Sequence, residues 1–176
     1  VIPDKEQRRE YVERNSERKK TNAIRRKIRL SNKAYLQEWS FFCTFTFSGK
    51  LHTEESFRTS LRNQLKHLVN RRGWKHIGVW ERGGDTERLH FHGIFYIPTG
   101  GMVGELKETR DYSTKDRRMQ TAMQNTYFLE RYGRNDFQAL GTPMEVRSSL
   151  RYLMKYIEKS GERLIYGGYL PSYFVS

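Results

Sequence analysis

Apolar and polar residues follow three different patterns along this chain, and each pattern predicts a kind of element. Residues 39–47 form a run of aromatic and β-branched side chains, which predicts a buried strand. Segments 76–82 and 89–97, separated by a Gly-Gly-Asp turn, predict two more strands. A helix is predicted over 54–71, with Thr53 as its N-cap. Its apolar residues recur at helical spacing: Phe57, Leu61, Leu65 and Leu68.

A later helix has the clearest start in the chain, because Thr142-Pro143-Met144-Glu145 matches a capping box with proline in the first turn. Its apolar stripe is expected to consist of Val146, Leu150, Leu153 and Ile157. At about 100° per residue, Tyr152 and Tyr156 project away from that stripe. Lys155 and Lys159 lie further round on the same side. The helix should therefore pack by one face and present tyrosines and lysines along another.

Two segments differ from this pattern. Residues 1–38 alternate basic and acidic side chains and are interpreted as a basic, helical N-terminal arm. Either this arm is a solvated helix with internal ion pairs, or it makes auxiliary contacts with DNA. Residues 39–176 then form the main domain. Within it, 102–141 is interpreted as an insertion, with a helix expected around 114–131 and an irregular or short strand segment ending at Gly141.

Composition narrows the class of protein. A length of 176 residues with 36% hydrophobic content suits one compact domain with a real core. The net charge of +13 favours an anionic partner, and nucleic acid fits better than a membrane. No segment approaches the roughly 20 apolar residues of a membrane span. The single cysteine, Cys43, lies in an apolar run and is expected to be buried. A reducing compartment such as a bacterial cytoplasm fits.

Two histidines on one predicted strand are candidate metal ligands. His90 and His92 are two residues apart, so they point to the same face of the strand. If Glu81 of the preceding strand pairs with His90, then Val79 lies opposite His92. Two nitrogens and a carboxylate suit Mn²⁺ or Mg²⁺ acting on a phosphate, with Zn²⁺ as an open alternative. A structural histidine pair and a solvated glutamate would give the same pattern.

The tyrosines of the later helix are candidate nucleophiles. Tyr152 with Lys155, and Tyr156 with Lys159, have the i, i+3 spacing of helix neighbours. A phenol with a pKa near 10 needs help to attack phosphorus at neutral pH. A lysine can stabilise developing negative charge, and a metal can polarise the phosphate. Half-buried tyrosines beside surface lysines are the structural alternative.

At these residues the chain resembles the HUH endonuclease family, the replication initiators of rolling-circle plasmids and single-stranded DNA phages and viruses. His90-Phe91-His92 is similar to the histidine–hydrophobic–histidine motif. Residues 42–47 resemble the family's first motif, a hydrophobic strand that bears threonines. Residues 152–159 resemble the two-tyrosine motif of the small isometric phage initiators. The motifs follow in the family's order and cover about residues 40–160.

The resemblance implies an α+β fold, a ferredoxin-like or RRM-like palm with a central antiparallel sheet and flanking helices. It also implies that a tyrosine attacks a phosphodiester in single-stranded DNA or an origin hairpin, leaving a 5′-phosphotyrosine and a 3′-hydroxyl. Tyr156 ranks above Tyr152 as the first nucleophile. The chain has no phosphate-binding Gly-x-x-x-x-Gly-Lys loop. A separate or host helicase and replication machinery would therefore be the partners.

Two other functions remain compatible with these motifs. One is the nuclease domain of a transposase or conjugative relaxase, which uses the same chemistry on another substrate. The other is a non-catalytic RRM-like module that binds nucleic acid. In either case Trp80 or Tyr132 could stack on bases, although for Trp80 core packing is the favoured interpretation.

Overall fold

The computed structural model describes residues 4–83, 87–113, 116–160 and 162–171, without the side chains of 159 and 160. The chain divides into two compact units. One contains Val1–Leu36 and Pro171–Ser176, and the other contains Gln37–Leu170. All the candidate site residues belong to the second unit.

A single helix, α1 (Lys5–Tyr35), accounts for most of the first unit. Asp4 caps it, and Gln7 completes a capping box with Asp4. Most of its side chains are exposed, and Glu10 and Arg14 form an ion pair at 3.0 Å one turn apart. The basic arm is thus helical with at least one internal ion pair, and a contact with DNA stays a prediction.

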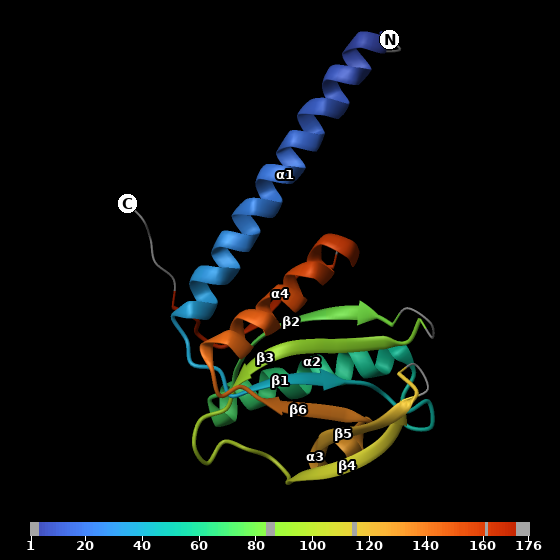
Figure 1. The fold of residues 1–176 in the computed structure, drawn as a ribbon, viewed down its shortest axis with the longest axis vertical. Coiled ribbons are helices and arrows are strands. Elements are labelled where there is room, and N and C mark those ends of the chain that lie inside the picture. Colours follow the sequence, from blue (N-terminus) through green and yellow to red (C-terminus); the bar gives the residue numbers. More distant parts are fainter. Residues whose placement is uncertain (1–3, 84–86, 114–115, 161, 172–176) are drawn as a thin grey trace. The chain divides into compact units, whose positions relative to one another are not determined.

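The second unit is built on a five-stranded antiparallel sheet with the order β6-β1-β3-β2-β7 (Figure 1). Its strands are β1 (Phe41–Phe45), β2 (Lys75–Arg82), β3 (Leu89–Tyr96), β6 (Asn135–Ala139) and β7 (Ile165–Gly167). Its helices are α2 (Glu54–Arg72), α3 (Thr126–Arg131) and α4 (Pro143–Ser160). An α+β fold of the RRM-like palm type, with helices flanking the sheet, is therefore confirmed.

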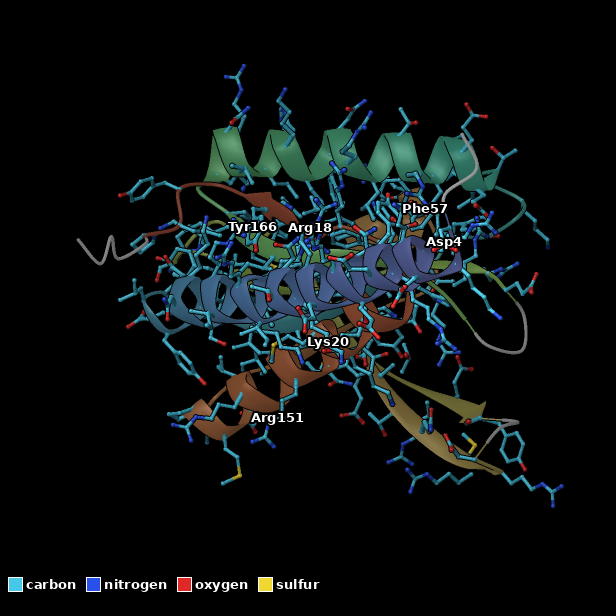
Figure 2. All side chains as sticks on the ribbon, turned by 90° about the horizontal axis from the view of Figure 1, so that it is seen from above. Asp4, Arg18, Lys20, Phe57, Arg151 and Tyr166 are labelled. Atoms are coloured by element: carbon cyan, nitrogen blue, oxygen red, sulfur yellow. The ribbon has the colours of Figure 1, made fainter. Side chains whose placement is uncertain are left out.

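The two faces of the sheet have different partners, because side chains alternate along each strand. One face carries Phe91 and Phe95 of β3 and forms the main core with α2 and α3. Helix α4 contacts β2 and β3. Leu150 and Leu153 of α4 are buried, as are the alternate residues of β2 and β3. Figure 2 shows α2 and α4 on opposite sides of the sheet. The catalytic candidates lie on the α4 side.

The helix boundaries expected from the sequence are confirmed. Thr53 caps α2, and its hydroxyl accepts a hydrogen bond from Ser56 N. At the start of α4, Glu145 N donates to Thr142 Oγ1 at 3.2 Å, while the Glu145 carboxylate accepts from Thr142 N at 3.0 Å. No helix within the described residues is long and apolar enough to cross a membrane.

The helix expected around 114–131 is wrong for most of its length. Strands β4 (Leu106–Ser113) and β5 (Arg118–Asn125) form a separate hairpin, and only α3 is helical. Side chains of β6 hold the end of this hairpin. Asn135 Oδ1 accepts from Asn125 N at 2.7 Å, and Asp136 Oδ1 accepts from Met123 N at 2.9 Å. These bonds and the hairpin ladder outweigh a weak helical pattern.

Three other expectations concern burial. Cys43 is buried, as expected. Trp80 is 3% exposed and packs in the main core, which confirms the favoured interpretation. Tyr132 is 2% exposed and hydrogen-bonds to Ser60, so base stacking by Tyr132 is wrong.

One buried histidine makes stability depend on pH. His76 of β2 packs against Phe91 and Phe95, and its Nδ1 has no hydrogen-bond partner among the described residues. Burial lowers the pKa of His76 from 6.5 to about 4. The unfolded chain binds this proton below about pH 6.5, whereas the folded chain binds it only below about pH 4. The stability that comes from a neutral His76 is therefore lost as the pH falls through that window.

We expect the free energy of unfolding to fall between about pH 6.5 and about pH 4, with His76 contributing up to about 3 kcal/mol. Urea denaturation across this range measures it. His76→Leu should flatten the pH dependence, and the exposed control His67→Gln should not. Equal slopes for wild type and His76→Leu would contradict this assignment.

Candidate active site

Strand β3 lies between β1 and β2, and the register on its two sides brings the site together. On one side Thr44 pairs with His92. On the other, Glu81 pairs with His90 and Val79 with His92, which confirms the register expected from the sequence. Since paired residues share a face of a sheet, the threonine, the carboxylate and both imidazoles lie on the same surface.

Two threonines of the first motif hold the two imidazoles. Thr44 Oγ1 lies 3.1 Å from His92 Nδ1, and Thr46 Oγ1 lies 3.1 Å from His90 Nδ1. A hydrogen bond at Nδ1 leaves Nε2 of each ring for another partner, and it limits rotation of the ring. The sequence pattern indicated the threonine strand but not this role for its hydroxyls.

Glu81 connects the histidines to the tyrosine helix. Its Oε2 lies 2.7 Å from His92 Nε2, and it also accepts a hydrogen bond from the Tyr156 hydroxyl. Burial acts to raise the pKa of Glu81, but the hydrogen bonds from His92 and Tyr156 outweigh burial and lower this pKa overall. Glu81 is therefore ionised at neutral pH.

Helix α4 places Tyr152 and Tyr156 against the histidine strand. The Tyr156 ring is nearly parallel to the His92 ring, with centroids 5.9 Å apart and an interplanar angle of 11°. The centroid of Tyr152 lies 4.7 Å from that of Tyr156 and 5.5 Å from that of Phe42, and the ring meets Phe42 edge-on. Both candidate nucleophiles thus meet His92 at one place.

The tyrosine hydroxyls form a chain that leads to Glu81. Tyr152 donates to Tyr156, and Tyr156 donates to Glu81. Burial raises the pKa of Tyr152 strongly, and donation to Tyr156 raises it further. Burial also raises the pKa of Tyr156, although the hydrogen bond from Tyr152 opposes this rise. Both phenols are therefore protonated at neutral pH.

The site opens into a groove of about 1730 Å³. Its floor carries His90, His92 and Glu81, and α4 contributes Tyr152, Tyr156 and Lys155 along one side. Residues 118–122 of β5 also line it. The other basic residues around it are Lys50, Arg88, Arg118 and Arg134. Lys155 is exposed, and the side chain of Lys159 lies outside the described residues. The groove therefore suits an anionic polymer.

One acidic residue of this groove was missed by the sequence reasoning. Asp136 of β6 pairs with Thr44 across β1 and lines the groove. Its carboxylate is occupied by Met123 N and by Gln138 Nε2, each at 2.9 Å. Residue 136 lay in the segment that the sequence left as irregular or a short strand, so no pattern could place it beside Thr44.

The donor set fits a divalent cation in its chemistry. His90, His92 and Glu81 offer two imidazole nitrogens and a carboxylate on one surface, with both Nδ1 atoms held by threonines. Among the residues the structure describes, however, no three such side chains already converge as a metal cluster. The Glu81–His92 hydrogen bond occupies the place between two of the donors. A cation bound by both would replace that bond.

Comparison with known proteins adds one finding. Residues 40–161 match the family model of the replication-associated protein ORF2, which covers more than half of the chain. The matched range includes both the histidine strand and the tyrosine helix. Neither a curated protein nor a solved structure matches the chain significantly.

The hydroxyl chain gives a prediction for the metal-free protein. We expect Tyr152→Phe to raise the pKa of Tyr156, because the phenolate loses a donor. Glu81→Gln should lower it, because a neighbouring negative charge is removed. The pH dependence of the ¹³Cζ chemical shift of labelled tyrosines measures both. The same Tyr156 pKa in wild type and both variants would refute the hydroxyl chain.

Proposed function

Since the chain belongs to the replication-associated protein ORF2 family, which indicates a role in DNA replication, we propose that it nicks and rejoins single-stranded DNA to initiate rolling-circle replication. One observation carries the proposal. Glu81 contacts His92 of the metal-capable strand and Tyr156 of the tyrosine helix at the same time. A cation site and a nucleophile can therefore act on the same phosphate.

The proposed reaction is a transesterification. The Tyr156 oxygen attacks the phosphorus in line, the Oη–P bond forms, and the bond from phosphorus to the 3′ oxygen breaks. The phenol proton leaves toward Glu81, its hydrogen-bond acceptor, and the departing oxygen gains a proton to become a 3′-hydroxyl. One phosphate ester replaces another, so the 5′-phosphotyrosine can later be attacked by a 3′-hydroxyl without ATP.

The surroundings of the phenol define what else the reaction needs. Burial raises the pKa of Tyr156, so attack requires positive charge nearby. Lys155 lines the groove and can neutralise charge on the phosphate. By its spacing from Tyr156, Lys159 is proposed for the same task. Mn²⁺ or Mg²⁺ held by His90, His92 and Glu81 would supply further charge to polarise the phosphate.

Tyr156 is proposed to act first and Tyr152 second. Tyr156 donates directly to Glu81, and the hydrogen bond from Tyr152 favours its phenolate. Tyr152 reaches Glu81 only through Tyr156, and its pKa is raised strongly. Two adjacent tyrosines would allow one to hold the DNA while the other makes the next cut. The strand must be single or extruded to enter, so unwinding is assigned to a separate or host helicase.

We expect Tyr156→Phe, His90→Ala and His92→Ala to abolish nicking of a labelled single-stranded origin substrate, with binding affinity within about threefold of wild type. Losing the nucleophile or a ligand should cost at least about 10³-fold in rate. Tyr152→Phe should still nick but should fail in a second strand transfer. Denaturing gels of cleaved and rejoined products measure both steps.

The matched control is Tyr169→Phe, an exposed tyrosine outside the groove, which should keep full activity. Nicking by His92→Ala at the wild-type rate would refute the metal assignment. Loss of the first cut in Tyr152→Phe would reverse the order of the tyrosines. Undiminished binding by the wild type, with no cleavage of any origin or transposon-end substrate, would favour the non-catalytic module.

The threonines give an independent prediction. We expect the double substitution Thr44→Val and Thr46→Val to weaken Mn²⁺ binding about 10–100-fold, because the imidazole rings lose the bonds that orient them. Isothermal titration calorimetry measures this, and thermal unfolding checks the fold. Thr59→Val, on the exposed side of α2, is the control. Unchanged Mn²⁺ affinity would show that the threonines do not position the ligands.

A further inference from the structure

The β4–β5 hairpin has one packed face and one open face. Ala122 and Gln124 on the packed face are almost completely buried, and Gln124 donates to Thr109 Oγ1 across the hairpin at 3.0 Å. The opposite face carries Tyr112 paired with Met119, and Arg110 paired with Thr121. Tyr112 is 58% exposed and Met119 is 60% exposed. A large aromatic side chain and a thioether thus stand side by side in solvent, which core packing does not explain.

This open face is continuous with the candidate active site. Met119 and Thr121 line the same groove as His90 and Tyr156. In Figure 2 the hairpin extends from the sheet on the side on which α4 lies, away from α2. A strand lying between the catalytic tyrosines and the hairpin would therefore meet Met119 as it leaves the site.

The charges of the hairpin favour a polyanion. Arg110, Arg117 and Arg118 form no ion pair with any described residue. The acidic residues Asp111 and Asp116 are engaged, since Asp111 pairs with Arg134 at 3.4 Å and Asp116 accepts from Gln120 at 2.6 Å. Arginines beside an exposed aromatic side chain are the combination that binds phosphates and stacks bases of single strands.

On these grounds we propose that the open face of the β4–β5 hairpin binds single-stranded DNA next to the scissile phosphate. Tyr112 and Met119 stack on bases, and Arg110 and Arg118 bind the adjoining phosphates. The site rests on the proposed function for its position in the reaction but not for its affinity. It lies outside the metal and tyrosine groups, so binding and cleavage can be measured separately.

The test is fluorescence anisotropy of a labelled, mixed-sequence single-stranded oligonucleotide in EDTA, where cleavage is blocked. We expect Tyr112→Ala with Met119→Ala to weaken binding about tenfold or more. Arg110→Ala with Arg118→Ala should reduce the slope of log affinity against log salt concentration by about 1.4, the value for two phosphate contacts on a single strand. All four side chains are exposed, and thermal unfolding confirms that each variant is folded.

Matched controls separate this site from general charge and exposure. Tyr169→Ala removes an exposed tyrosine elsewhere, and Arg62→Ala removes an exposed arginine of α2; both should bind as wild type does. Wild-type affinity in the hairpin variants, or an equal loss in the controls, would overturn the proposal. So would an unchanged affinity accompanied by a loss of self-association, which would assign the face to a second copy of the chain.

The same variants distinguish this proposal from the nuclease proposal. If the hairpin variants bind weakly and the wild type forms no covalent adduct with DNA, the binding site stands and the nuclease assignment fails. If wild type and hairpin variants form adducts equally at subsaturating DNA, the nuclease assignment stands and the hairpin site fails.

Discussion

Backbone pairing on both sides of β3 positions the chemistry of this protein. Pairing with β1 brings Thr44 to His92, and pairing with β2 brings Glu81 to His90. Because side chains alternate, a slip of one residue would turn both imidazoles into the main core and Phe91 toward the groove. The buried side chains of the opposite face therefore fix the register of the site. No long loop is needed to assemble it.

Helix α4 adds the nucleophiles, and its position has an electrostatic consequence. The side chains of Leu150 and Leu153 are buried, while Tyr152 and Tyr156 reach His92. Burial stabilises the neutral phenols, so the resting site is unreactive. In our account, a phosphate with its cation and the surrounding basic side chains supplies the positive charge that activates a tyrosine. Substrate binding and activation are thus coupled.

Local patterns allowed much of this to be predicted. Capping boxes and helical spacing located α2 and α4, and the two-residue period of His90 and His92 indicated their common face. Non-local contacts could not be predicted. The Thr44–His92 bond joins residues 48 positions apart, and Asp136 reaches the site only through the pairing of β6 with β1. The β4–β5 hairpin was mistaken for a helix because bonds from β6 hold it, and its own sequence signals this weakly.

The identity of the tyrosine that becomes bound to DNA tests the central claim most directly. Trypsin cleaves after Arg151, Lys155 and Lys159, so Tyr152 and Tyr156 fall on different peptides. The protein would be incubated with a 3′-labelled single-stranded origin oligonucleotide and Mn²⁺, denatured, digested with nuclease and trypsin, and analysed by mass spectrometry. Our account predicts a nucleotide on the peptide that begins with Tyr156. No modified peptide, or modification of a residue outside the groove, would contradict it.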